Sequence, residues 1–254
     1  MSAPVNRFKA RLRDKDTLIG LWMALGDPSA AELCATTGFD WLVVDAEHGP
    51  NELRDILTIL RAAHGHQGLV VRPRDDNRAL IKQVLDIGAQ TLLVPMIESA
   101  DQAREVVRSG MYAPLGVRGV GASLARASAY GSVANYVTTA NDEICLLLQV
   151  ETRLGIDNLE QILAVEHVDG IFIGPADLAA DMGYPGNSDA PEVQAVIRDA
   201  LTRIRAANKA AGILTMDRAQ AASYLRHGVD FLAVGSDVTI LAAGLRDLRA
   251  AFSS

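Results

Sequence analysis

Polar residues that can carry acid–base and metal chemistry follow several short apolar runs in this sequence. In chain order they are Asp45, Glu47, His48, Arg72, Gln149, Glu151 and Asp177. Glu151 and Asp177 follow neighbouring runs, so their carboxylates can supply two oxygen ligands to a divalent cation. With two protein ligands, several positions stay open to water and substrate oxygens, as is usual for Mg²⁺ or Mn²⁺. This pair therefore predicts a metal site that accepts a substrate.

The remaining polar residues suggest how such a site would handle protons and charge. His48 lies three residues after Asp45, within reach of a dyad in which the carboxylate orients the imidazole and raises its basicity. Arg72 ends an apolar run, where its guanidinium can stabilise a developing enolate or alkoxide. A glycine-proline turn precedes Ala176 and Asp177, whose backbone N–H groups predict an anion site at a helix start.

Structural roles for the same residues stay open at this level. Asp177 can cap the helix that opens at Ala176, and Glu151 can pair with Arg153 or Arg72. The backbone turn before Ala176 can equally be a plain tight turn. Seven polar residues at one edge favour the functional interpretation over separate structural ones.

Eight apolar runs alternate with amphipathic stretches along the chain, the pattern of βα units with a parallel sheet. The runs are residues 18–25, 41–45, 68–72, 91–95, 144–151, 170–175, 212–216 and 231–235. Helical periodicity falls at residues 51–64, 77–88, 99–110, 158–165, 191–211, 217–228 and 237–252. We predict an α/β fold, a (β/α)8 TIM barrel formed by residues 1–254 as one domain, whose active site lies at the carboxyl ends of the strands.

Composition excludes several other classes of protein. The net charge of -7 argues against binding to nucleic acid, which needs a basic face. Cys34 and Cys145 are isolated, so neither a disulfide framework nor a thiolate zinc site is expected. The absence of a long apolar stretch and of a secretion signal at the start predicts a cytoplasmic protein without a membrane span.

Lysine is scarce, and its positions bear on the chemistry. The chain holds four lysines, and none ends a predicted strand: Lys9, Lys15, Lys82 and Lys209. Covalent aldol chemistry needs a lysine there to form a Schiff base with a carbonyl substrate. If the barrel performs carbonyl chemistry, a metal must act as the electron sink.

Several motifs together carry a family resemblance over nearly the whole chain. They are IGLW at residues 19–22, FDWLVVDAEH at 39–48, VVRP at 70–73, TLLVP at 91–95, GVRGVG at 116–121, QVE at 149–151 and GPAD at 174–177. In this combination the chain resembles the HpcH/HpaI family of class II, metal-dependent pyruvate aldolases, and within it the 4-hydroxy-2-oxoheptanedioate aldolases.

The resemblance implies a role for each matching residue. His48 would be the catalytic base and Arg72 the residue that stabilises negative charge, whereas Glu151 and Asp177 would hold Mg²⁺, Mn²⁺ or Co²⁺. Gln149 and the backbone of Ala176 and Asp177 would bind the pyruvyl group. The resemblance also implicates Asp86, placed on a predicted helix, in raising the basicity of the histidine, a role that the spacing assigns to Asp45.

The implied reaction is reversible cleavage of a 4-hydroxy-2-oxo acid to pyruvate and an aldehyde, through a pyruvate enolate that the metal stabilises. The implied assembly is a homo-oligomer, a hexamer built as a trimer of dimers that exchange the C-terminal helix. Aldolases acting on 2-keto-3-deoxy sugar acids, metal-dependent phosphoenolpyruvate-type chemistry and a non-enzymatic binding module remain as alternatives.

Overall fold

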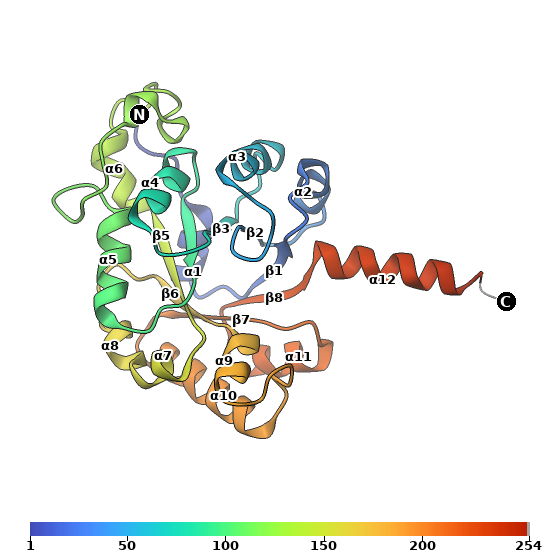
Figure 1. Cartoon of the computed structure of the whole chain (residues 1–254). Helices are drawn as coiled ribbons and strands as arrows, with labels where there is room; N and C mark the ends of the chain where they lie inside the picture. The colour runs from blue at the N-terminus through green and yellow to red at the C-terminus, as the bar shows by residue number, and fades with distance from the viewer. Residues whose placement is uncertain (253–254) are drawn as a thin grey trace.

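Eight parallel strands form a closed barrel in the order of the sequence, as a computed structural model that describes residues 1–252 shows (Figure 1). The strands are β1 (Leu18–Met23), β2 (Trp41–Asp45), β3 (Leu69–Arg72), β4 (Thr91–Val94), β5 (Cys145–Val150), β6 (Gly170–Ile173), β7 (Ala210–Leu214) and β8 (Phe231–Ser236). β8 pairs with β1 and closes the barrel. The predicted (β/α)8 architecture is confirmed, with strand ends that shift by one to two residues at most positions.

Helices cover the outside of the barrel, and most connect one strand to the next. They are α1 (Arg7–Arg13), α2 (Pro28–Ala35), α3 (Leu53–Ala62), α4 (Arg78–Asp86), α5 (Ala100–Gly110), α6 (Tyr136–Glu143), α7 (Arg153–Asp157), α8 (Leu159–Leu163), α9 (Pro175–Asp181), α10 (Pro191–Ala206), α11 (Arg218–Arg226) and α12 (Asp237–Ala250). The side chains of Asn77, Ser99 and Asp217, the residues at which three of the predicted helices begin, cap α4, α5 and α11. No helix within residues 1–252 is long and apolar enough to span a bilayer.

Two helical predictions need correction. The helix predicted at residues 191–211 ends at Ala206, because Ala210 already begins β7 and pairs with β6. The helix predicted at 158–165 corresponds to the shorter α8, and a separate short helix that was not predicted, α7, precedes it with Thr152 as its cap. The short helices α1, α2 and α6 were not predicted, since short helices depend on tertiary packing more than on local pattern.

Alternation along the strands separates an inner core from an outer one. Parallel strands covered on both faces are buried throughout, as in β2. Trp41 and Val43 point into the barrel and pack with Phe172 and Phe231, whereas Leu42 and Val44 pack outward against the helices. Gly20 lies where a Cβ atom would come 2.1 Å from the Trp41 ring, so glycine makes room for the indole.

The amino end of the barrel is closed by α1. Phe8 and Leu12 of this helix belong to the inner core, and the Phe8 ring lies 6.1 Å from the Trp41 ring. The inner core fills the barrel from this end, so the open end is the one formed by the carboxyl ends of the strands. The functional side chains must therefore project there.

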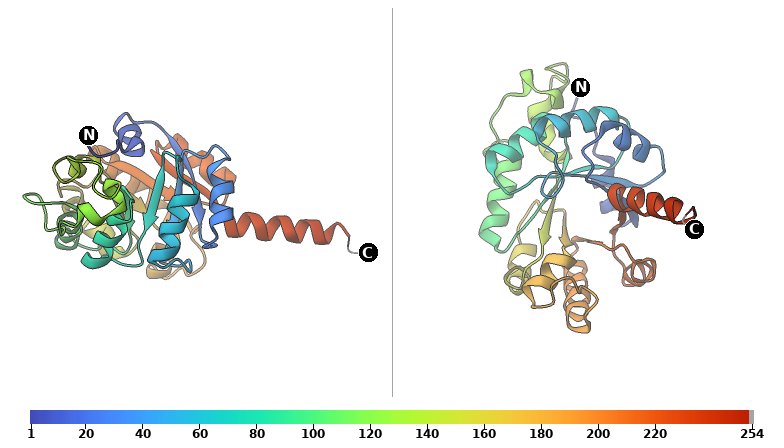
Figure 2. Two further views of the ribbon diagram at one scale, coloured as in Figure 1. Left: turned by 90° about the horizontal axis from the view of Figure 1, so that it is seen from above. Right: turned by 45° about the vertical axis from the view of Figure 1, so that its right-hand side comes forward.

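The last helix leaves the body of the molecule. α12 begins after β8 with a capping box formed by Ser236 and Thr239, and it extends away from the barrel (Figures 1 and 2). Of the residues in α12, only Asp237 at its start is buried. Beyond its start, where it contacts β1 and β8, the helix is largely exposed within residues 1–252.

Candidate active site at the mouth of the barrel

The period of two along the strands places the predicted residues inside the mouth. In β2, Asp45 continues the inward series of Trp41 and Val43, and in β3, Arg72 continues that of Val70. Along β5 the inward series runs Cys145, Leu147, Gln149 and Glu151. Asp45, Arg72, Gln149 and Glu151 are all 5% exposed or less. Each is therefore a polar cap on an apolar inward face.

Arg72 is held by two carboxylates. Its Nε and Nη2 atoms donate to Oδ1 and Oδ2 of Asp45 at 2.9 and 2.7 Å, and Nη1 forms an ion pair with Oε2 of Glu47 at 2.5 Å. The guanidinium also lies 4.9 Å from the centre of the Trp22 ring. Burial acts to raise the pKa of Asp45, but the hydrogen bonds and charge of Arg72 hold that pKa below its ordinary value. Arg72 is a fixed, oriented donor at the mouth.

The predicted dyad between the side chains of Asp45 and His48 is not formed in the structure. Both carboxylate oxygens of Asp45 are occupied by Arg72, and Oδ2 also accepts from the Trp22 indole at 3.1 Å. Asp45 does contact His48, but through the backbone N–H at 3.3 Å. The imidazole is 67% exposed, and its Nε2 lies 3.9 Å from Oε2 of Glu47. Spacing alone missed this because the Arg72 side chain comes from the neighbouring strand, where its Cα lies opposite that of Asp45.

Glu151 is fixed at both oxygens. Oε1 accepts the backbone N–H of Met96 at 3.0 Å, and Oε2 accepts a short hydrogen bond from Nε2 of Gln149. A Cβ atom at Gly174 would come 2.2 Å from Oε2, so glycine is required there. Burial raises the pKa of Glu151 above its ordinary value, and the charges of Glu47 and Asp177 add to the rise. None of the ion pairs found among residues 1–252 joins Glu151 to an arginine.

Asp177 lies in the first turn of α9, at the start of the connection that follows β6. The helix begins at Pro175, one residue before the predicted start. Its N-cap residue is Gly174, so no side-chain hydrogen bond caps the first turn. Ala176 and Asp177 are exposed, and their N–H groups belong to the unpaired first turn. The arrangement leaves both the Asp177 carboxylate and these N–H groups available to a ligand.

The mouth suits a divalent cation held by few protein ligands. The charges of Glu47 and Asp177 raise the pKa of Glu151, and a cation would relieve this repulsion. The buried Oε1 atom of Gln149 has no hydrogen-bond partner. Among residues 1–252, no group of three or more His, Cys, Asp or Glu side chains is arranged around a single metal position. A cation here would complete its coordination with water and substrate oxygens.

Asp86 lies away from this mouth within its own chain. It ends α4, which begins just after β3 at the mouth and runs toward the amino end of the barrel. Its carboxylate accepts from Nη2 of Arg118 at 2.6 Å, and the Arg118 guanidinium lies 4.5 Å from the centre of the Tyr112 ring. Within residues 1–252, the structure therefore shows Asp86 as the counter-ion of a fully buried arginine.

None of the four lysines ends a strand, as predicted. Lys9 lies in α1 at the closed end, with its Nζ 3.5 Å from Asp169. Lys209 lies between α10 and β7, not within a helix as predicted, and its Nζ donates to the carbonyl of Val168 at 2.6 Å. A Schiff-base lysine is absent from the mouth formed by the described residues.

Sequence reasoning missed two contributors to the site. Glu47 was placed at the rim without a role, and it is the second carboxylate on Arg72. Met96 was not considered, yet its N–H fixes Glu151 from a left-handed backbone with φ of 56°. A non-glycine residue in this conformation is uncommon and strained. The Gly-Pro turn signalled Gly174, but no sequence pattern marks Met96.

Comparisons with known proteins agree with this geometry. Residues 18–243 match the family model described as HpcH/HpaI aldolase/citrate lyase. A hydroxypyruvate/pyruvate aldolase from Pseudomonas aeruginosa is 56% identical, over 99% of this chain and 94% of that protein. A 2-keto-3-deoxy-L-rhamnonate aldolase from Salmonella typhi is 50% identical, over 98% of this chain and 94% of that protein.

A solved structure has the same fold throughout. The crystal structure of an HpcH/HpaI aldolase/citrate lyase family protein from Burkholderia cenocepacia J2315 is 39% identical, with a TM-score of 0.93, covering 98% of this chain and 100% of that one. These likenesses extend over almost the full length of the chain. The chain therefore belongs to the HpcH/HpaI aldolase/citrate lyase family.

Proposed function

We propose that this protein catalyses the reversible aldol cleavage of a 4-hydroxy-2-oxo acid to pyruvate and an aldehyde. The observation that carries the proposal is the convergence of Arg72, Gln149 and Glu151 on the inner face of one barrel mouth, beside Asp177. Its chemical class is supported by the 56% identical relative named hydroxypyruvate/pyruvate aldolase. Hydroxypyruvate therefore joins pyruvate as a nucleophile to be tested.

A divalent cation, Mg²⁺, Mn²⁺ or Co²⁺, belongs to this proposal, with Glu151 and Asp177 as its protein ligands. When bound, the cation would act as a Lewis acid that polarises the 2-oxo group. Support comes from the raised pKa of Glu151, which reflects burial next to other carboxylates, and from the unpartnered Oε1 atom of Gln149. The protein's own part is to hold Glu151 rigidly through Met96 and Gln149.

The remaining residues divide the work of binding and proton transfer. The N–H groups of Ala176 and Asp177 hold the substrate carboxylate, and Gln149 binds the pyruvyl group beside it. His48 removes the 4-hydroxyl proton, since its exposed imidazole is free to turn toward a substrate and Glu47 lies 3.9 Å from it. The bond between C3 and C4 breaks, the aldehyde departs, and Arg72 stabilises the negative charge of the pyruvate enolate until it is protonated.

A 2-keto-3-deoxy sugar acid is the second candidate substrate. It is favoured by the 50% identical relative named for 2-keto-3-deoxy-L-rhamnonate. Both substrates place the same 2-oxo acid end at the mouth, so the choice between them depends on the rim. There the side chains of Met96 and Met216 are 44% and 51% exposed, and Thr215 Oγ1 is already bonded to Gln220. These two exposed methionine side chains add apolar surface beside the mouth and favour an aldehyde of low polarity.

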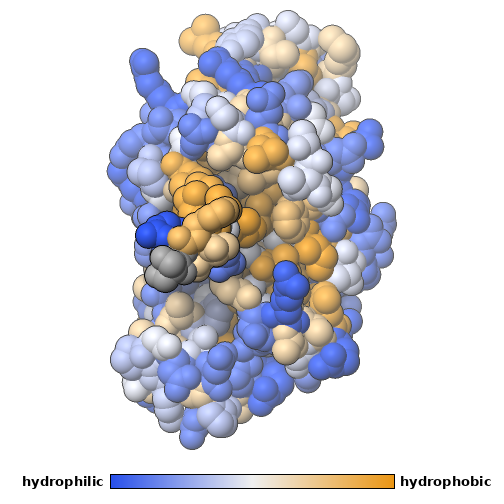
Figure 3. All heavy atoms as spheres, turned by 90° about the vertical axis from the view of Figure 1, so that its right-hand side faces the viewer, coloured by the Kyte–Doolittle hydropathy of each residue, from blue (hydrophilic) through white to orange (hydrophobic). Residues whose placement is uncertain are grey.

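The assembly belongs to the proposal as well. We infer a homo-oligomer, a hexamer made of three dimers, in which α12 packs on a partner subunit. Hydrophobic residues gather on α12 and on the surface around it (Figure 3). Among them Ile240, Leu241, Leu245 and Leu248 are each more than half exposed. Leaving such a helix in water is unfavourable by about 25 cal/mol for each Å² of apolar surface.

The reaction is tested by incubating the protein with pyruvate or hydroxypyruvate, a panel of aldehydes and Mg²⁺, Mn²⁺ or Co²⁺. We expect an aldol product that disappears with a chelator and is unaffected by borohydride. Glu151→Gln should abolish it, whereas Glu192→Gln, an exposed glutamate of α10, should leave it unchanged. Inactivation by borohydride in the presence of pyruvate would contradict the proposal, because it would reveal a Schiff base.

A further inference from the structure

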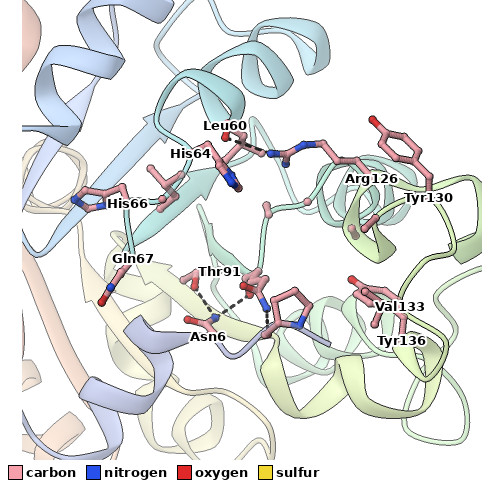
Figure 4. Close-up of a pocket in the computed structure, with 18 residues that line it drawn as sticks. Asn6, Leu60, His64, His66, Gln67, Thr91, Arg126, Tyr130, Val133 and Tyr136 are labelled. Carbon is pink, nitrogen blue, oxygen red and sulfur yellow. Dashed lines mark hydrogen bonds between the residues drawn. The ribbon is translucent and has the colours of Figure 1, made fainter. Parts of the chain in front are cut away.

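A second cavity lies near the amino end of the barrel, away from the mouth. Its volume is about 460 Å³, which is in the range of small-molecule sites. It lies between the end of α3, the start of β4 and the segment that runs from Arg126 to Tyr136 (Figure 4). Leu69 and Thr91, the first residues of β3 and β4, form part of its wall, whereas Arg72 ends β3 at the opposite side.

Arg126 extends across this cavity without an acidic partner. Its Nη1 and Nη2 atoms donate to the carbonyls of Ile87 at 2.9 Å and Leu60 at 3.4 Å, at the ends of α4 and α3. None of the salt bridges found among residues 1–252 includes it. Burial lowers the pKa of Arg126, and the positive charge of Arg61 lowers it further. A half-buried guanidinium in this state lacks a counter-charge and would gain from an anion.

The other residues that line the cavity supply no competing negative charge. No Asp or Glu is among them. His66 already uses both ring nitrogens. One contacts the Phe39 carbonyl at 2.9 Å, and the other accepts the Gly68 N–H at 3.2 Å, which is the hydrogen-bonding pattern of a neutral imidazole. His64 is exposed at the rim of the cavity. Two helices end here, and their negative dipole ends disfavour any anion, but an anion with two or three charges more than one with a single charge.

An aromatic side chain stands at the entrance on a rigid support. Tyr130 is 62% exposed, and it follows Ala129, both with left-handed backbone at φ of 56° and 51°. The buried Ser128 hydroxyl accepts the N–H of Gly131 at 2.9 Å and thereby fixes this turn. Strained backbone of this kind persists where the surrounding structure holds it, often at ligand clamps. Tyr136 and Val133 add apolar surface inside.

We propose that this cavity is a second binding site, for a small organic monocarboxylate with a planar, apolar body. The carboxylate would lie on the Arg126 guanidinium, and the ring would pack beside Tyr130 and Tyr136. The single arginine can bind one carboxylate, and the other residues that line the cavity, which are uncharged and largely apolar, can pack against an aromatic ring. The site is independent of the proposed aldolase reaction, because its residues lie away from the mouth.

Benzoate serves as the probe, titrated by calorimetry into the full-length protein with pyruvate and Mg²⁺ already saturating the mouth. We expect one benzoate per chain at millimolar concentration or tighter. Arg126→Gln should weaken binding about tenfold or more, the usual effect of losing a charge-assisted hydrogen bond. Arg61→Gln is the matched control, a neighbouring arginine that does not line the cavity, and it should change the affinity less than about twofold.

A second variant keeps the proposal testable if Arg126→Gln fails to fold, since Arg126 also binds the ends of α3 and α4. Tyr130→Ala removes an exposed ring and should weaken benzoate binding about fivefold without loss of thermal stability. Several results would overturn the proposal: no binding of benzoate to the assembled protein, equal affinity in all variants, displacement of benzoate by pyruvate, or tighter binding of inorganic phosphate than of benzoate.

Discussion

Arg72 and Asp45 form a two-point contact across neighbouring strands. Nε lies 2.9 Å from Oδ1 and Nη2 lies 2.7 Å from Oδ2, and the register of β2 and β3 places their Cα atoms opposite one another. Both side chains are almost completely buried. The contact fixes the plane of the guanidinium, so the charge that faces a substrate is oriented before binding.

Asp45→Asn should therefore lower kcat/KM by about 100-fold, because Arg72 loses its bidentate partner and its orientation. The pH at which the basic group titrates in the rate profile should not move, since Asp45 does not contact the His48 imidazole. Trp22→Phe is the matched control, because it removes the 3.1 Å hydrogen bond from the indole to Asp45 and keeps an aromatic ring beside Arg72. Trp22→Phe should lower kcat/KM by about threefold. A shifted pH profile with full activity at the optimum would restore the Asp45–His48 dyad.

Gly174→Ala should displace Glu151, because the new Cβ atom would come 2.2 Å from its Oε2. We expect the dissociation constant for Mn²⁺, measured by calorimetry, to rise about 10- to 100-fold, as is typical when the support of a metal ligand is disturbed. Gly235→Ala is the control, since its Cβ would meet atoms no closer than 3.6 Å. Unchanged Mn²⁺ affinity in Gly174→Ala would separate Glu151 from the metal site.

The raised pKa of Glu151 predicts how stability without metal depends on pH. The contribution of Glu151 to the free energy of unfolding is fully present below its ordinary pKa near 4.5. This contribution is lost as the pH rises through the higher pKa that Glu151 has in the folded state. Glu151→Gln should therefore raise the melting temperature of the metal-free protein at pH about 8, but not at pH about 4. Mn²⁺ should stabilise the wild type at the higher pH and not the variant. A destabilised variant at pH about 8 would contradict this sign.

Asp86→Asn should leave the buried Arg118 without its counter-ion. Arg118 has a fully buried side chain, and its Nε and Nη1 atoms have no hydrogen-bond partner. Because Asp86 is a quarter exposed, we expect a loss of about 1 to 3 kcal/mol in the free energy of unfolding. Asp75→Asn, at an exposed ion pair, should cost less than about 0.5 kcal/mol. Equal denaturation midpoints for the two variants would show that the contact with Arg118 contributes little.

The apolar face of α12 predicts an assembly that charge can disrupt. Leu241→Glu combined with Leu245→Glu should convert the oligomer to smaller species in size-exclusion chromatography with light scattering, because two charges would have to be buried. Arg246→Glu changes the net charge by the same amount on the same exposed helix without removing apolar surface. It should leave the assembly intact. A monomeric wild type would contradict the proposed exchange of this helix.

Most of the barrel could be predicted from the sequence because strand formation has a local signal. Buried parallel strands appear as short runs of Val, Ile and Leu, and β2 was located to the residue. Boundaries failed where the local signal was neutral. The alanine-rich end of α10 continues a helical pattern, yet pairing with β6 makes Ala210 part of a strand. Tertiary pairing overrode local preference there.

What the sequence by itself determined is the set of polar residues that caps the inward face, since alternation along a strand leaves no choice of side. Only the tertiary structure decided which of them are partners. Asp45 binds Arg72 instead of the imidazole three residues away, and Glu151 depends on the N–H of Met96 from a different connection. Closure of the barrel brings such groups together from distant parts of the chain. The spacing of residues within one segment cannot predict contacts of this kind.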